Sequence, residues 1–233
     1  MGASVPKVLL PINGRPLLRY VLESARAAGA TRVIVVVGTQ KEQVMAAFRQ
    51  DGVEFVEQEG QHGTADAVLA CRDRLADAEE CVVLCGDAPL IRPQTIQRLV
   101  QARQAAGADV AVFTARLASP ARYGRVVRGR GDSIERIVEQ RDATPELLAI
   151  NEVNSGAYSF RWGRARPALE RIRPSPVSGE YYLTDIVREV RDEGGQAVAV
   201  LATDPDEMLG ANTPDELAAL ERGLAARREP SAG

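Results

Sequence analysis

Hydrophobic residues along the first half of the chain follow two alternating periods, one typical of amphipathic helices and the other of buried strands. Apolar residues recur at helical spacing over residues 16–28, and a β-branched run follows at 32–37. The same succession occurs three more times, with helices expected at 41–48, 64–75 and 93–105, and strands at 53–56, 81–85 and 109–114. This alternation predicts an α/β fold with a doubly wound, mostly parallel, Rossmann-like sheet covered by helices on both faces.

After about residue 117 the pattern changes to short alternating strands separated by polar turns. Strands are expected at 125–128, 134–139, 157–160 and 197–201, and helices at 163–171 and 183–193. Thr213, Pro214 and Glu216 then stand in the order of a helix cap, a first helical position and a capping-box glutamate. The second half is therefore predicted to form a small β-rich extension that lines the substrate site, followed by a closing helix.

The composition is that of a globular domain that can bury a core: 233 residues, 45% of them hydrophobic and 26% charged. Its apolar runs are far shorter than the roughly 20 residues that a membrane span needs, and the first residues do not have the pattern of a signal peptide. We therefore expect a cytoplasmic protein with no membrane partner. The net charge of −3, with acids and bases interleaved, argues against a nucleic-acid partner.

Cysteine, histidine and lysine are scarce. Three cysteines and a single histidine, His62, disfavour a disulfide framework, a structural zinc site and a histidine-based metal centre. Only Lys7 and Lys41 are lysines among 29 basic residues. A lysine kept in an arginine-rich chain indicates a need for its compact ammonium, although a lysine near the start of a chain is usually solvated surface.

The loops directly after apolar strands are where an open α/β sheet binds its ligands. Asp87 follows Gly86 at such a strand end, and a carboxylate there suits Mg²⁺, which takes one or two protein oxygens and fills its other positions with water and phosphate. The alternative is a turn aspartate that caps the next helix. Asn212, beside the last helix start, is similarly either an oxygen ligand near a metal or part of the helix entry.

The loop 58–64 follows another expected strand and opens a helix. The Gln58 amide can hydrogen-bond the edge of a nucleobase, and Gly63 and Thr64 offer N–H groups at a helix N-terminus to anionic oxygens. An ordinary capping loop is the alternative. His62 is expected to be a loop residue without a catalytic role.

The order and spacing of these features resemble the N-terminal uridylyltransferase domain of the bacterial bifunctional N-acetylglucosamine-1-phosphate uridylyltransferases, members of the sugar nucleotidyltransferase family. The resemblance covers essentially the whole chain. Its segments are 6–9, 58–64, 86–90, 123–125, 138–143, 154–156, 179–185 and Asn212. It implies one nucleotidyltransferase domain over residues 1–228, with a nucleotide-binding part at 1–117, a sugar-binding part and closing helix at 118–228, and a frayed tail at 229–233.

The resemblance also implies the site residues. Mg²⁺ would be held by Asp87 and Asn212, and Lys7 would lie against the phosphates as the second catalytic residue. The expected substrate contacts are Gln58, Gly63 and Thr64 on the uracil and ribose side, Gly124, Glu139 and Asn154 on the sugar side, and Cys85, Gly86 and Asp87 at the strand end between them. Members of the family often carry tyrosine where this chain has Cys85, so we expect backbone rather than side-chain contacts at that position.

The reaction implied by the resemblance is transfer of UMP from UTP to N-acetylglucosamine 1-phosphate, giving pyrophosphate and UDP-N-acetylglucosamine, a precursor for the cell wall. A phosphate oxygen of the sugar would attack the α-phosphorus in line, which needs alignment and charge neutralisation but no protein nucleophile. The alternatives are a related transferase with another base or sugar, or a catalytically impaired paralogue that binds sugar nucleotides.

Two parts of the family pattern are missing. The first strand and its Gly-rich loop are absent, and Met1 falls where that loop would end, so we hypothesise that the natural protein begins upstream. Without that central strand and the loop's phosphate ligands we expect the rate to fall ~10³-fold or more. The hexapeptide repeats of the acetyltransferase half are also absent, so acetyl transfer and the trimer built by that half are not predicted, and the oligomeric state stays open.

Overall fold

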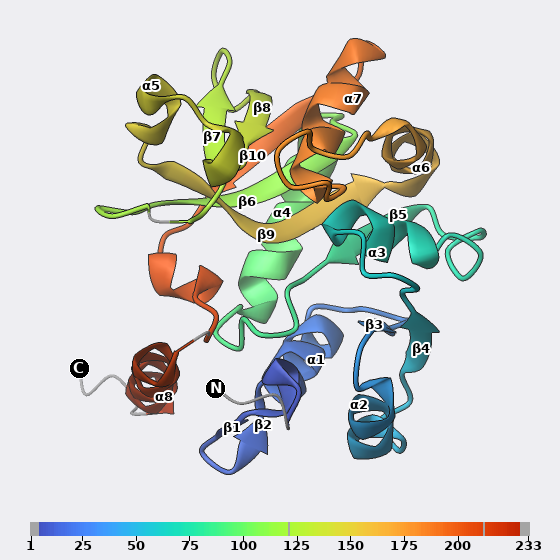
Figure 1. The fold of residues 1–233 in the computed structure, drawn as a ribbon, viewed down its shortest axis with the longest axis vertical. Helices are drawn as coiled ribbons and strands as arrows, with labels where there is room; N and C mark the ends of the chain where they lie inside the picture. Colours follow the sequence, from blue (N-terminus) through green and yellow to red (C-terminus); the bar gives the residue numbers. More distant parts are fainter. Residues whose placement is uncertain (1–4, 121, 212, 229–233) are drawn as a thin grey trace.

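A six-stranded sheet forms the centre of the fold, and most of its strands come from the second half of the chain (Figure 1). The computed structural model describes residues 5–120, 122–211 and 213–228. The strands of this sheet are β5 (Glu80–Val83), β6 (Val110–Arg116), β7 (Arg125–Arg128), β8 (Ile134–Val138), β9 (Glu152–Arg161) and β10 (Ala197–Leu201). They stand in the order β10-β6-β9-β7-β8, and β5 also pairs with β9.

Strand β9 gives this sheet its mixed direction. β10 pairs with β6 in parallel, but β9 runs antiparallel to β5, β6 and β7, and β7 pairs with β8 in the same antiparallel way. The α/β class predicted from the sequence is confirmed, whereas the expected predominance of parallel pairing is corrected to a mixed sheet. A strand buried on both faces is apolar whichever way its neighbours run, so the sequence pattern reports burial and not direction.

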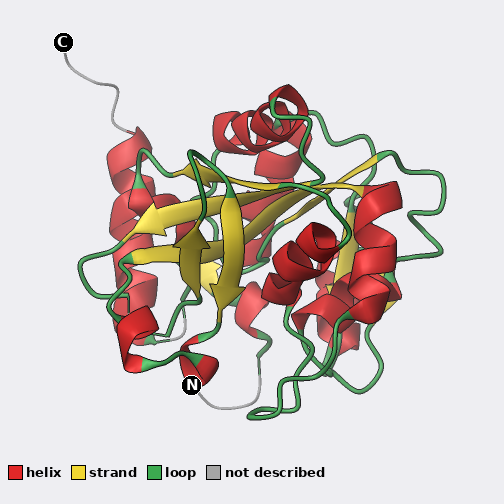
Figure 2. Ribbon diagram, turned by 90° about the horizontal axis from the view of Figure 1, so that it is seen from above, coloured by secondary structure: helices red, strands yellow, loops and turns green. Residues whose placement is uncertain are grey.

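Helices cover both faces of the sheet, as Figure 2 shows from above. Val110 and Val112 of β6 belong to a core cluster with α3 (Thr64–Ala70), α6 (Trp162–Arg171) and α7 (Ile186–Asp192). Ala111 and Phe113, which alternate with them, pack with α4 (Pro93–Ala105) on the other side. This double coverage explains why the run that predicted the strand is continuously apolar.

The first part of the chain forms a separate two-stranded sheet. β3 (Ile34–Val37) and β4 (Glu54–Glu57) pair in parallel and pack against α1 (Leu17–Ala27) and α2 (Lys41–Phe48). The hairpin of β1 (Pro11–Ile12) and β2 (Arg15–Pro16), preceded by the 3₁₀ turn Lys7–Leu9, leads into α1. In the part of the chain that the structure describes, β3 pairs only with β4, and β5 only with β9. A further strand in the centre of the sheet stays a prediction.

The last helix, α8 (Pro214–Arg228), begins as the sequence predicts. Thr213 Oγ1 accepts a hydrogen bond from the Glu216 N–H (3.2 Å), and Glu216 Oε2 accepts one from the Thr213 N–H (3.1 Å), which completes the capping box. The remaining elements are α5 (Pro145–Leu148) and the 3₁₀ turns Gln140–Asp142, Leu183–Asp185 and Pro205–Met208.

The division of the chain near residue 117 stays a prediction, and the tail at 229–233 lies outside the described residues. Over those described residues, none of the helices combines the length and the apolar character that crossing a membrane requires.

Candidate functional site

Asp87 lies in the turn that follows β5, where the sequence predicts a cation ligand. The Ala88 N–H closes this turn by donating to the Cys85 carbonyl (3.2 Å). The Asp87 carboxylate forms an ion pair with the Lys7 ammonium, which comes from the 3₁₀ turn Lys7–Leu9. Both side chains are partly exposed, 26% for Asp87 and 36% for Lys7. The two residues predicted to be catalytic are therefore in direct contact at a surface that a ligand can reach.

The segment that leads to Asn212 runs beside the same carboxylate. A Cβ built on Gly210 would lie 3.0 Å from Asp87 Oδ2. Asn212 itself lies outside the described residues, so its role as a second oxygen ligand stays a prediction. A carboxylate oxygen at a partly exposed strand end fits Mg²⁺, which needs few protein ligands. Over the described ranges, no group of three or more His, Cys, Asp and Glu side chains could hold a metal ion.

The Cys85 side chain packs against β9 at the edge of the site. Its Sγ lies 3.7 Å from the Gly156 carbonyl oxygen, and a Cβ built on Gly156 would come within 2.5 Å of that sulfur. Burial raises the pKa of the Cys85 thiol to about 12, with the Asp87 charge adding to the shift and the Lys7 charge opposing it. The sulfur is therefore a protonated packing group at neutral pH and not a nucleophile.

Alkylation tests this assignment. At pH 8 a thiol with a pKa of about 12 is ionised in about one molecule in 10⁴, so we expect iodoacetamide to modify Cys85 about 10³-fold more slowly than a free cysteine. Peptide mapping by mass spectrometry measures this rate, and the urea-unfolded protein serves as the control. Equal rates of labelling in the folded and unfolded states would contradict the assignment.

The loop that opens α3 is joined to the loop before α7 by hydrogen bonds. The Tyr181 N–H donates to the His62 carbonyl (2.8 Å), and the Tyr181 carbonyl accepts from the Ala65 N–H (2.9 Å). Thr64 Oγ1 accepts a third hydrogen bond from the Leu183 N–H (2.9 Å). Two loops that the sequence assigned to the nucleotide side and the sugar side therefore form one continuous wall.

Glu139, Gly124 and Asn154, the three residues predicted for the sugar side, are neighbours. A Cβ built on Gly124 would lie 3.4 Å from Glu139 Oε1, and the Gly124 carbonyl accepts from the Asn154 N–H (2.9 Å). Asn154 Oδ1 accepts from the Gly156 N–H (3.0 Å). Thr184 Oγ1 donates to Glu139 Oε1 (3.0 Å), which orients the carboxyl group.

Burial raises the pKa of Glu139, and the hydrogen bond from Thr184 opposes that shift. The neighbouring charges of Asp142, Asp185 and Glu180 raise the pKa further. Since the pKa of this acid is raised, Glu139 takes up a proton at a higher pH than a free glutamate does. Its capacity to accept hydrogen bonds as a carboxylate is present above the raised pKa and is lost as the pH falls through it.

These contacts form a series that connects the predicted residues across the site. Its links are Lys7 with Asp87, Cys85 with Gly156, Asn154 with Gly124, Glu139 with Thr184, Leu183 with Thr64, and Gly63 with Gln58. Gly86 stands between Cys85 and Asp87, and a Cβ built on it would lie 3.3 Å from Leu18 of α1. Two residues beside this site, Gly210 and Asp66, are not predicted by the motifs. Asp66 carried a weak signal as the acidic residue in the first turn of α3, whereas Gly210 carried none.

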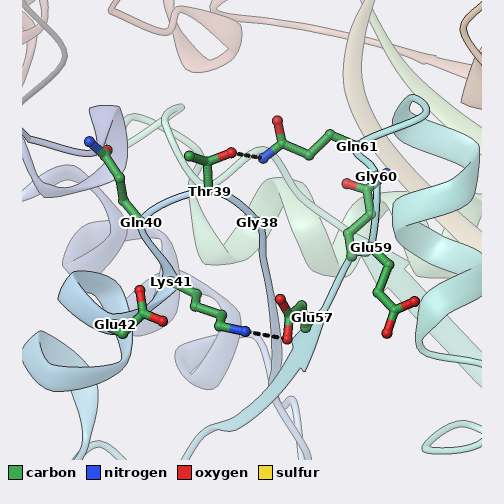
Figure 3. A pocket seen from close by; sticks show the side chains of 10 residues that line it. Gly38, Thr39, Gln40, Lys41, Glu42, Glu57, Glu59, Gly60 and Gln61 are labelled. Carbon is green, nitrogen blue, oxygen red and sulfur yellow. Dashed lines mark hydrogen bonds and ion pairs between the residues drawn. The ribbon is translucent and has the colours of Figure 1, made fainter.

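A polar hollow of about 430 Å³ opens beside these contacts, at the carboxyl ends of β3 and β4 (Figure 3). Gln58 lines it and also belongs to the predicted site. Lys41 Nζ pairs with Glu57 Oε2 across the hollow (2.5 Å), and Gln61 Nε2 donates to Thr39 Oγ1 at its rim (2.9 Å). The carboxyl ends of a parallel strand pair are where α/β sheets bind ligands, so this opening gives access next to Gln58.

Known proteins match the chain along most of its length. Residues 1–152 match the family described as the MobA-like NTP transferase domain. The chain belongs to this family. The chain is 42% identical over 229 residues to the bifunctional protein GlmU of Trichlorobacter lovleyi, covering 97% of this chain and 50% of that protein. It is 38% identical over 223 residues to the same-named protein of Koribacter versatilis, covering 94% and 48%. The chain spans about half the length of the curated relatives it matches.

Two solved structures share the fold of this chain. UDP-glucose pyrophosphorylase complexed with UDP-glucose superposes with a TM-score of 0.69 at 19% identity, covering 96% of this chain and 92% of that one. CMP:2-keto-3-deoxy-manno-octonic acid synthetase complexed with CTP superposes with a TM-score of 0.69 at 21% identity, covering 97% and 95%. These structures confirm the predicted fold, and the family match and the GlmU relatives confirm the resemblance predicted from the motifs.

Proposed function

We propose that this nucleotidyltransferase domain transfers UMP from UTP to N-acetylglucosamine 1-phosphate, with Mg²⁺, and releases UDP-N-acetylglucosamine and pyrophosphate. The observation that carries the proposal is the series of contacts from Lys7 and Asp87, past Asn154 and Glu139, to Gln58, in which neighbouring residues of the sequence join one contact to the next. It supports a site in which both substrates lie along one wall. The similarity to the GlmU proteins over 94–97% of this chain supports the choice of base and sugar.

The chemistry is a displacement at the α-phosphorus of UTP. An oxygen of the sugar phosphate forms a new bond to that phosphorus, and the bond to the β-phosphate oxygen breaks, so the electron pair leaves with pyrophosphate. Both reactants are anions, and Lys7 would neutralise part of their charge while holding them in line. Asp87, together with Asn212, would hold Mg²⁺, which when bound supplies further charge neutralisation at the phosphates.

The walls of the site would position the two ends of the substrates. Glu139, as a carboxylate fixed by Thr184, would accept hydrogen bonds from the sugar, and Asn154 and Gly124 would line the same side. Gln58 would face the uracil, with Gly63 and Thr64 beside the ribose. No protein nucleophile is needed, which agrees with the protonated Cys85 thiol.

Pyrophosphate release tests the proposal. With Mg²⁺ and N-acetylglucosamine 1-phosphate, we expect UTP to react with a kcat/KM at least about 10²-fold above that of CTP or GTP. Glucose 1-phosphate in place of the acetamido sugar is the matched control for the sugar. Faster release with another base or sugar would identify a related transferase, and binding of the sugar nucleotide without any release would identify an impaired paralogue; either result contradicts the proposal.

A further inference from the structure

The Gln58 amide is held in one orientation by two hydrogen-bond acceptors. Its Nε2 donates to the Gly63 carbonyl oxygen (2.8 Å) and to Asp66 Oδ2 (2.9 Å). A carbonyl and a carboxylate have no proton to donate, so only the NH₂ end of the amide can face them. The chemistry of the two partners therefore fixes which end of Gln58 is nitrogen, and the carbonyl oxygen points away from both.

Asp66 is the stronger of the two constraints. The Gly63 carbonyl also accepts the Ala67 N–H of α3 (3.2 Å), so it shares its acceptor capacity with the helix. Asp66 stands in the first turn of α3, where the N–H groups of a helix favour a negative charge. A hydrogen bond to an ionised acceptor is roughly twice as strong as one between neutral groups. Removing the Asp66 charge is therefore the change that most weakens the preference of the Gln58 amide for one orientation.

We propose that Asp66 is a positioning residue that selects the base by holding the Gln58 carbonyl oxygen toward the ligand. An acceptor opposite ring position 3 pairs with the N3–H of uracil, whereas cytosine carries an unprotonated nitrogen there and is repelled. Thymine has the same N3–H as uracil and is not distinguished. The inference rests on the proposed function, in which Gln58 faces the base, and it adds the residue that gives Gln58 its selectivity.

The test is equilibrium binding by titration calorimetry of UTP, dTTP and CTP, each with Mg²⁺, to the full chain. The wild type is expected to bind UTP at least about tenfold more tightly than CTP. In Asp66→Asn a neutral amide that can present its oxygen or its NH₂ replaces the carboxylate, so only the Gly63 carbonyl still favours one orientation of Gln58. We therefore expect the UTP-to-CTP ratio to fall about tenfold while the UTP-to-dTTP ratio is unchanged. Gln58→Met, which removes both ends of the amide, should give the same loss of selectivity.

Asp73→Asn is the matched control. It removes an equal charge from the same stretch of chain, at a side chain that is 90% exposed and lies 3.9 Å from its partner Arg72. We expect its UTP-to-CTP ratio to equal that of the wild type. Asp66→Glu, which keeps a carboxylate, should retain a preference for UTP.

Each outcome bears on the inference. An unchanged UTP-to-CTP ratio in Asp66→Asn overturns it, and so does an equal loss of affinity for all three nucleotides, which would mean that Asp66 only supports the loop. A wild type that prefers CTP, or that binds no UTP, also overturns it. Selective UTP binding without transfer to N-acetylglucosamine 1-phosphate contradicts the proposed function alone, and transfer with an unchanged ratio contradicts the inference alone.

Discussion

Replacing Asp87 by asparagine is expected to lower kcat/KM for pyrophosphate release by about 10³-fold. Asparagine keeps the size of the side chain but removes the charge that would hold a divalent cation and that pairs with Lys7. In a site that works by alignment and charge neutralisation, single electrostatic groups commonly account for effects of about 10²–10⁵-fold. Initial rates over a range of UTP and Mg²⁺ concentrations measure the loss, and excess Mg²⁺ should restore only part of the rate.

Asp77→Asn is the control for Asp87→Asn because it makes the same chemical change at a residue outside the predicted site. The Asp77 carboxylate is exposed and pairs with Arg32 (2.8 Å), so we expect a rate within about twofold of the wild type. The loss of activity in Asp87→Asn must not come from unfolding. The partly exposed ion pair between Asp87 and Lys7 contributes at most about 1 kcal/mol to the free energy of unfolding. A loss of about 4 °C or less in the thermal midpoint is therefore expected. A wild-type rate in Asp87→Asn would remove the proposed cation role.

The sequence predicts well those elements that are bounded by glycine or proline residues. The helix at 93–105 and the strands at 125–128 and 197–201 have the predicted bounds. β9 is the instructive exception, because its strand was expected only at 157–160 and begins at Glu152. Glu152 is buried, and its carboxylate is satisfied by Thr114 Oγ1 (2.7 Å) and by the guanidinium of Arg128 (2.8 Å). A polar residue made compatible with a buried strand by distant partners leaves no periodic signal.

Some contacts of the site can be predicted from the order of motifs in the sequence, whereas others follow only from the tertiary structure. The order of motifs predicts which residues gather, and contacts such as Lys7 with Asp87 and Gly124 with Asn154 agree with it. The supporting contacts do not follow from order. The bond from Gln58 to Asp66 depends on the angle at which α3 leaves its loop, and the approach of Gly210 to Asp87 depends on how the last loop packs across the first half of the fold.

Gly63→Ala is expected to have the second large effect, on stability and activity together. Gly63 has a φ of +126°, which side chains with a Cβ rarely adopt, and a Cβ there would lie 2.5 Å from the Tyr181 carbonyl oxygen and 2.7 Å from its nitrogen. Those atoms are backbone, so the clash cannot be relieved by a change of rotamer and the two loops must separate. We expect the free energy of unfolding in urea to fall by about 3 kcal/mol. We also expect kcat/KM to fall by about 10²-fold, because Gln58 and Thr64 lose their positions.

Gly107→Ala separates the two causes of the loss at Gly63. Gly107 also has a positive φ, +63°, but a Cβ there would meet nothing within 4 Å, so only the backbone conformation is penalised. Its expected cost is about 1 kcal/mol with unchanged activity. If both variants lose the same stability and keep the same kcat/KM, then close packing of Gly63 on Tyr181 is unimportant and the joined loops are not required for the site. If Gly63→Ala alone loses activity, the backbone contact between the loops is what holds the nucleotide side against the sugar side.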